Sequence, residues 1–393
     1  MAAPGIIIHQ IFPFGAFGPR QWSESELRRL MRWLKTLGYA DVLFIPWGIY
    51  RAEDGPLTIL EQGALYQSGL MAAPAFEPGQ LYAPEDPFLG TRDGLRRAET
   101  LRITARAARE FGLRPWLALM TTLGAPGFTR EHPELAAVNG IDLFNEGVGL
   151  CPSQPAARQH LLDLYEQQVR YFDAAAGFVL WQRDPGGCRC DRCMPQARMM
   201  GDLGNAFLAM IRRHRREEPV AFSAWHVNLA EVPDLARTLD PCLLIFESPR
   251  IHAADVSLDI FEERVKAWQV QGRQVESWLE VQENPTSLLP SVYPERMAEA
   301  VRRIQRLELA RVWVSATQNP YLFPLHLWLT PRLWAEPADA GRLTAKFLRS
   351  TYGDYAVESG LDYAQATERA FDLTQALSTR AAGFLNLFVV TSP

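Results

Sequence analysis

The chain has 393 residues, of which 48% are hydrophobic and 22% charged, with a formal net charge of -5 and a sequence pI of about 5.9. This composition can bury a large core in one big α/β domain or in two to three smaller ones. No run of Lys or Arg alternates with aromatic residues, so an acidic chain of this kind is not expected to bind nucleic acid.

No apolar stretch approaches the ~18 to 20 residues that cross a membrane, so we expect no membrane partner. The apolar run at residues 5–8 follows no positively charged segment, and His9 and Gln10 interrupt it. This pattern predicts a first strand rather than a signal peptide, and hence a cytoplasmic protein. The oligomeric state cannot be predicted.

Eight short β-branched or aromatic runs alternate along the chain with longer segments of helical periodicity. This alternation is typical of repeated β/α units and a parallel sheet. The runs are residues 5–14, 40–47, 114–122, 177–184, 220–227, 242–249, 275–282 and 310–318. Eight such units predict an α/β fold, a (β/α)8 TIM barrel, over residues 1–335.

Helices are predicted between these runs. The clearest are residues 23–38, 154–172, 257–272 and 293–308. The first opens with an acidic turn behind Ser23 and ends at Gly38, and the last has Pro294 at its first turn. After the eighth run the chain becomes helical again, which predicts a small C-terminal helical segment, residues 336–393, packed on the barrel.

Two connections are too long to be ordinary turns. Residues 48–90 follow the second run and residues 123–150 follow the third. Long loops of this kind in a compact domain tend to be functional, and both follow the strand ends where barrel enzymes build their sites.

In a closed barrel the residues at the carboxyl ends of the strands converge on one cleft. Three acids occupy such positions, Asp184, Glu247 and Glu280. Taken alone, each is most simply a solvated charge or a helix cap. Candidate substrate-binding residues lie at equivalent positions on seven of the eight strands. They are His9, Gln10, Trp47, Arg183, Trp225, His226, Arg250, Trp278, Gln318 and Asn319.

Carboxylates set among tryptophans and amides suit the hydrolysis of a glycosidic bond. That reaction needs one protonated carboxyl to assist the leaving oxygen and one ionised carboxyl to attack or to activate water. We expect Asp184 to be the general acid, with its pKa raised by surrounding aromatic residues, and Glu280 to be the base or nucleophile, with Glu247 assisting. Arg183 or Arg250 could hold a substrate carboxylate by a two-pronged bond, or form a simple ion pair.

A family resemblance appears at these residues. The segment GFVLWQRDPGG, residues 177–187, resembles the strand-four segment of α-glucuronidases. Residues 318–356 are similar to the end of the barrel in α-glucuronidases and in β-N-acetylhexosaminidase-related barrels. The cysteine-containing segments around residues 151 and 188 resemble those of uncharacterised bacterial glycosidase-like proteins. The resemblance favours a uronic or an N-acetylated sugar as the substrate. The two long loops could wall off one end of the cleft, and they predict a glycosidase of carbohydrate metabolism that removes a terminal sugar from an oligosaccharide or glycoside, with no cofactor for catalysis.

The sequence departs from the family pattern in three ways. The acid after strand four is an aspartate instead of a glutamate, and the acid after strand six is a glutamate instead of an aspartate. The His-x-Gly-Gly-Asp-Glu pair of the hexosaminidases is absent, which argues against substrate-assisted hydrolysis by that pair.

Three cysteines, Cys188, Cys190 and Cys193, follow C-x-C-x2-C spacing, and Cys151 is the natural fourth ligand of a tetrahedral zinc site. Such a site would be structural, because four thiolates leave no position for a water. A disulfide such as Cys188 to Cys193, or free thiols, are the alternatives. Cys242 is expected in the core.

Other readings stay open. The chain could be a carbohydrate-binding barrel whose chemistry has lapsed, or a metal-dependent barrel hydrolase that uses His9, His226 and Glu247. The histidines His160, His214 and His252 are expected to be solvated.

Overall fold

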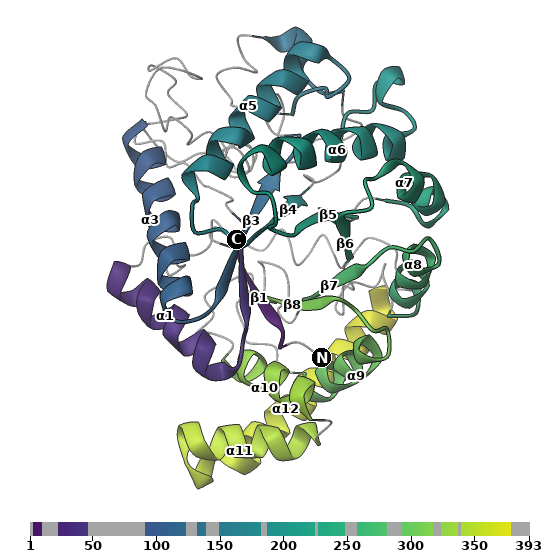
Figure 1. The fold of residues 1–393 in the computed structure, drawn as a ribbon. Helices are drawn as coiled ribbons and strands as arrows, with labels where there is room; N and C mark the ends of the chain where they lie inside the picture. The colour runs from purple at the N-terminus through teal and green to yellow at the C-terminus, as the bar shows by residue number, and fades with distance from the viewer. Residues whose placement is uncertain are drawn as a thin grey trace.

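The computed structural model describes residues 3–9, 23–45, 91–122, 132–138, 149–181, 187–224, 227–247, 258–280, 293–316, 324–336 and 339–378. Within them, eight parallel strands close into a barrel in chain order, each paired with its predecessor and successor (Figure 1). The strands are β1 Gly5–His9, β2 Asp41–Ile45, β3 Arg114–Met120, β4 Gly177–Trp181, β5 Val220–Ser223, β6 Leu243–Glu247, β7 Val275–Glu280 and β8 Arg311–Ala316. The predicted (β/α)8 barrel is confirmed.

Helices surround this barrel on the outside (Figure 1). They are α1 Glu24–Leu37, α3 Thr91–Glu110, α5 Pro155–Tyr171, α6 Gln196–His214, α7 Val232–Thr238, α8 Leu258–Val270, α9 Pro294–Gln305, α10 Pro324–Ala335, α11 Ala340–Tyr352 and α12 Val357–Ser378. Short 3₁₀ turns lie at η2 Pro133–Leu135, η3 Asp191–Cys193, η4 Leu229–Glu231 and η6 Asp354–Ala356. None of the described helices is long and apolar enough to cross a membrane.

Helix α1 begins and ends where its sequence signals predict. The hydroxyl of Ser23 accepts a hydrogen bond from the Glu26 N–H at 3.4 Å, and the Glu26 carboxylate accepts one from the Ser23 N–H at 2.7 Å. Gly38 ends the helix with φ 105°, a left-handed conformation that glycine adopts without steric cost.

The C-terminal helices α11 and α12 follow the barrel and lie beside α9 and α10 (Figure 1). The side chain of Glu368, on α12, accepts hydrogen bonds from the backbone N–H groups of Glu295 and Arg296 at 2.8 and 3.4 Å. A carboxylate that accepts from these two N–H groups caps the first turn of α9, so α12 is attached to the barrel shell there. The domain boundary at residue 335 stays a prediction.

Two tryptophans fill the barrel interior near the amino ends of the strands. Trp116 and Trp313 meet edge to face with ring centroids 5.3 Å apart. Each faces a glycine across the sheet, because Trp116 pairs in register with Gly177 and Trp313 with Gly5. A Cβ atom at either glycine would lie 2.5 Å from the facing indole ring. Glycine is therefore required on both strands to admit the two rings.

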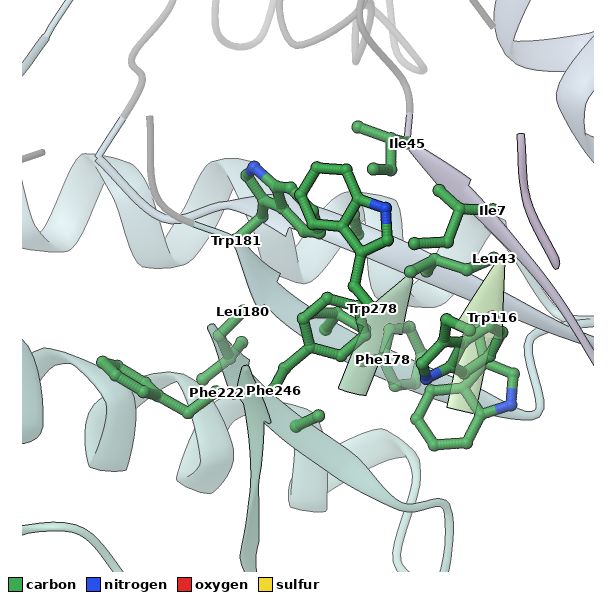
Figure 2. Close-up of a cluster of buried hydrophobic side chains, with 14 of the residues drawn as sticks. Ile7, Leu43, Ile45, Trp116, Phe178, Leu180, Trp181, Phe222, Phe246 and Trp278 are labelled. Carbon is green, nitrogen blue, oxygen red and sulfur yellow. The ribbon is translucent and has the colours of Figure 1, made fainter. Parts of the chain in front are cut away.

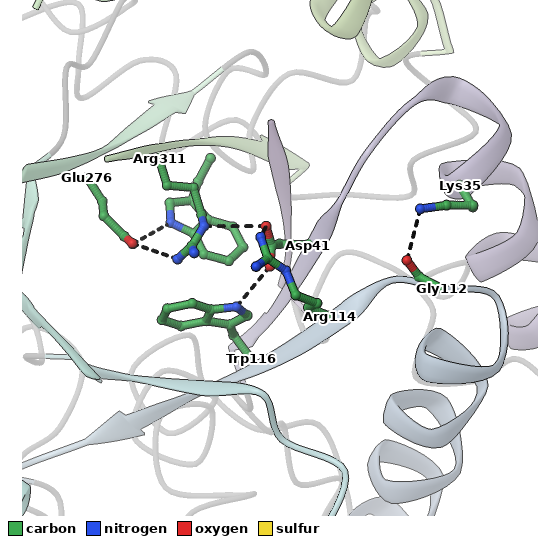
Figure 3. Close-up of polar contacts among 8 residues, drawn as sticks. Lys35, Asp41, Gly112, Arg114, Trp116, Glu276 and Arg311 are labelled. Carbon is green, nitrogen blue, oxygen red and sulfur yellow. Dashed lines mark hydrogen bonds and ion pairs between the residues drawn. The ribbon is translucent and has the colours of Figure 1, made fainter. Parts of the chain in front are cut away.

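A buried network of charges crosses the same end of the barrel (Figure 3). The carboxylate of Asp41 binds Arg114 at 2.7 Å and Arg311 at 3.4 Å, and Arg311 binds Glu276 at 2.6 Å. Asp41 and Glu276 are fully buried, and the two arginines balance their charge. Burial raises the pKa of Glu276, while the Arg311 guanidinium lowers it.

The indole N–H groups of the two tryptophans complete this network. Trp116 donates to Asp41 at 3.1 Å, and Trp313 donates to Glu276 at 2.9 Å. The Arg311 guanidinium lies 4.3 Å from the centroid of the Trp116 ring, within cation–π range. The two tryptophans thus both fill the barrel interior and take part in the buried charge network.

One of the three histidines, His160, differs from its expected state. His160 lies on the inner face of α5 and is only 7% exposed, so the expectation that it is solvated was wrong. Burial, with a smaller contribution from His132, lowers the pKa of His160 to about 4. His214 is exposed, as expected, and its ring contacts the carboxylate of Glu166. His252 lies outside the described residues.

Glu276→Gln should lower the free energy of unfolding by about 3 kcal/mol, because it leaves Arg311 with one anionic partner in a dry interior. Urea denaturation measures the change. Glu263→Gln, at an exposed position of α8, is the control and should change stability by less than about 0.5 kcal/mol. If the two substitutions change the free energy of unfolding equally, the buried charge network contributes nothing to stability.

The stability of the protein should fall as the pH drops from 6.5 to 4. The folded-state pKa of His160 lies below its ordinary value, so its contribution is present above pH 6.5 and is lost as the pH falls through the folded-state pKa of about 4. The loss amounts to about 3 kcal/mol at most. Urea denaturation across this range should show a shallower decline for His160→Gln, and an unchanged decline would contradict the assignment.

Candidate active site

A second aromatic layer fills the interior near the carboxyl ends of the strands (Figure 2). The Trp181 ring centroid lies 5.2 Å from that of Trp278 and 5.6 Å from that of Phe246. Phe246 also reaches down toward Trp313, with ring centroids 6.4 Å apart. The described interior is therefore a packed aromatic column, so a substrate site belongs above it, at the strand ends.

The strands that carry two of the predicted acids meet at this layer. Trp181 is the last residue of β4, and Asp184 follows it by three residues, outside the described part of the chain. Glu280 is the last residue of β7, and its backbone pairs in register with Ser315.

The structure places two of the predicted substrate-binding residues. Trp278 is a buried member of the aromatic layer, and His9 ends β1, where its backbone pairs with Ile45. The other eight lie outside the described residues, and their roles stay predictions. They are Gln10, Trp47, Arg183, Trp225, His226, Arg250, Gln318 and Asn319.

Glu247, the third predicted acid, faces helix α8 instead of the aromatic column. Its carboxylate is 1% exposed and accepts hydrogen bonds from Arg264 at 3.0 and 3.2 Å and from the indole N–H of Trp268 at 2.7 Å. The preceding residue, Phe246, points into the barrel, so alternation along β6 turns position 247 outward. The structure therefore does not bring Glu247 into contact with the aromatic layer.

Arg264 joins Glu247 to the end of β5. The same guanidinium donates to the backbone carbonyls of Ala224 at 2.9 Å and of Val227 at 2.5 Å. These two residues flank positions 225 and 226, where substrate-binding residues are predicted. Because the Arg264 guanidinium donates to one carboxylate and two carbonyls, it holds the ends of β5 and β6 in place relative to α8.

The sequence analysis did not identify Arg264 and Trp268 as partners of the site. Their spacing carried a signal, because residues four apart lie on the same face of a helix. An arginine and a tryptophan on the inner face of α8 indicate a buried acceptor on the strand beneath it.

The four predicted zinc ligands are brought together by the fold. The sulfur atoms of Cys151, Cys188, Cys190 and Cys193 all lie within 4.8 Å of one another, at the side of the barrel where β3 and β4 end. Cys242 is exposed in the turn before β6, so the expectation that it packs in the core was wrong.

The barrel is of the kind found in glycoside hydrolases, and the predicted resemblance is confirmed at the level of the fold. It resembles a family 89 glycoside hydrolase from Clostridium perfringens, solved with GlcNAc-alpha-1,4-galactose, with a TM-score of 0.61 and 14% identity over 89% of this chain and 39% of that one. It also resembles an O-GlcNAc hydrolase of Thermobaculum terrenum, with a TM-score of 0.56 and 10% identity over 91% and 64%.

A third similar structure is a GH138 enzyme targeting pectin rhamnogalacturonan II, with a TM-score of 0.60 and 11% identity over 96% of this chain and 44% of that one. The chain thus spans 39% to 64% of the length of these three proteins. Identities of this size show a shared fold. No model of a protein family matches the chain, and neither does any curated protein.

Arg264→Met should lower the free energy of unfolding by about 3 to 5 kcal/mol, because it leaves the buried Glu247 carboxylate without its cation. Lys266→Met, at an exposed position of the same helix, is the control. The double variant Arg264→Met with Glu247→Met should regain part of the loss, since no buried charge then lacks a partner. If denaturant titration shows that Arg264→Met lowers the free energy of unfolding no more than Lys266→Met does, this account is contradicted.

Proposed function

We propose that this chain is a glycosidase that removes a terminal sugar from an oligosaccharide or glycoside by carboxylate general acid/base catalysis. The observation that supports this most is the contact between Trp181 and Trp278 across the closed barrel. That contact draws together the ends of β4 and β7, the strands that lead to Asp184 and Glu280.

The few residues between each acid and the nearest tryptophan of the aromatic layer limit the distance between them. A chain advances at most about 3.6 Å per residue. The Cα atom of Asp184 therefore lies within about 11 Å of the Cα atom of Trp181, and that of Glu280 lies within about 7 Å of that of Trp278. Carboxyl groups in glycosidases are separated by roughly 5 to 9.5 Å. The backbone therefore allows the carboxyl groups of Asp184 and Glu280 to come within this separation.

Each residue has a distinct proposed task. Asp184 protonates the leaving oxygen, and the aromatic surroundings keep it neutral by disfavouring its charged form. Glu280 attacks the anomeric carbon or activates water. Glu247 assists as a positioning residue, because its carboxylate holds Arg264 and thereby the end of β5. Catalysis by these groups requires no cofactor.

For the substrate we propose a terminal N-acetylated sugar first and a uronic sugar second. Two of the similar structures support the first choice, since their names refer to O-GlcNAc and to GlcNAc-alpha-1,4-galactose. The α-glucuronidase resemblance supports the second choice, in which Arg183 or Arg250 would bind the substrate carboxylate.

Hydrolysis of nitrophenyl and of phenyl glycosides, in both anomeric forms, tests the proposal. Asp184→Asn should lower kcat/KM about 10²- to 10⁴-fold on phenyl glycosides and much less on nitrophenyl glycosides, whose leaving group needs little protonation. Glu280→Gln should reduce kcat/KM on phenyl and on nitrophenyl glycosides to a similar extent. Asp202→Asn and Glu263→Gln, at exposed positions of α6 and α8, serve as controls and should leave both rates unchanged.

Wild-type rates in Asp184→Asn would overturn the assignment of the acid. Binding of sugars without hydrolysis across the panel would favour a carbohydrate-binding barrel. Activity that is lost with a chelator while the melting temperature stays constant would favour the metal-dependent hydrolase that uses His9, His226 and Glu247.

A further inference from the structure

The four clustered sulfur atoms have the spacing of a single tetrahedral metal site. Cys151 Sγ lies 3.7 Å from both Cys190 Sγ and Cys193 Sγ, and all four sulfurs, with Cys188, fall within 4.8 Å of one another. Four sulfurs at about 2.3 Å from one zinc ion are separated by about 3.8 Å. The longest separation thus needs to shorten by only about 1 Å, which small side-chain rotations supply.

This spacing argues against the other uses of cysteine. None of the four cysteines forms a disulfide in the structure, and Cys151 is equally far from Cys190 and Cys193. An iron–sulfur cluster would need room for several irons and inorganic sulfides between the thiolates, and this group is too compact for them.

The surroundings of the cluster suit thiolates bound to a cation. Cys151, Cys188 and Cys193 are buried, and Cys190 is half-buried. The Cys188 sulfur accepts hydrogen bonds from the backbone N–H groups of Val138 at 3.2 Å and of Cys190 at 3.5 Å. N–H donors of this kind orient metal-bound thiolates and offset their negative charge.

We propose that Cys151, Cys188, Cys190 and Cys193 bind one zinc ion as a closed structural site. Zinc is the ion that four thiolates in tetrahedral geometry bind in structural sites, and the four sulfurs leave no position for a catalytic water. The site stands on the geometry of the cysteines alone and does not depend on the proposed glycosidase activity.

The zinc ion would fasten two loops to each other. Cys151 follows the bridge between Ala136 and Leu150, in the connection after β3, whereas the other three cysteines lie in the connection after β4. The Arg189 N–H also donates to the Val138 carbonyl at 2.6 Å, which joins the same two connections. The connection after β4 also contains Asp184, so the site would lie in the same connection as this predicted acid.

Metal analysis of the full chain, purified with a reductant and without chelator, tests the proposal. We expect about one zinc per chain, released in step with modification of the four thiols by an organomercurial. Growth with cobalt should give the thiolate-to-cobalt charge-transfer absorption of a four-sulfur site. Cys190→Ser should lose the zinc and lower the melting temperature by more than about 5 °C.

Cys242→Ser is the matched control, because Cys242 is exposed and lies outside the cluster. It should keep both the zinc and the melting temperature. A wild-type chain that contains no zinc and takes up none when zinc is added would overturn the proposal. So would a disulfide among the four cysteines in the intact mass of the unreduced chain, or one iron in place of zinc. Because wild-type metal content is measured directly, the test holds even if Cys190→Ser fails to fold.

Discussion

The interior of a closed ring of eight parallel strands must be filled, and this requirement governs the rest of the molecule. Trp116 and Trp313 fill the end where the strands begin, and they fit only because the strands beside them present Gly177 and Gly5. Their indole N–H groups also need acceptors, which the buried acids of the network supply. A large apolar side chain at one strand position thus determines a glycine on one neighbouring strand and a buried charge on another.

Because the described interior is filled, the proposed chemistry belongs at the carboxyl ends of the strands. Two groups of contacts link described segments at this end of the barrel. The cysteine cluster joins the connections after β3 and β4, and the pair of Glu247 with Arg264 joins the ends of β5 and β6 to α8. Segments that are held by a rigid shell position reactive groups more accurately than free loops do, and the proposed proton transfer to a leaving oxygen would need such positioning.

The sequence predicted the strands and helix ends well because their signals are local, such as the apolar runs and the acidic first turn behind Ser23. It could not predict the direction of Glu247. Strands of a parallel barrel are buried on both faces, so no alternation of polar and apolar residues separates inside from outside. The burial of His160 could have been predicted, since it falls three residues after the buried Ala157 on α5. Cys242 was misassigned because it adjoins an apolar run but precedes the strand, in a turn where Asp240 accepts its N–H.

The central claim is that two acids, distant in sequence, share one space above the aromatic layer. The most direct measurement is the separation between the carboxyl groups of Asp184 and Glu280 in a crystal structure with a bound monosaccharide. The account predicts a separation of roughly 5 to 9.5 Å with the anomeric carbon between them. Carboxyl groups on opposite sides of the barrel rim, with the sugar in contact with neither, would contradict it.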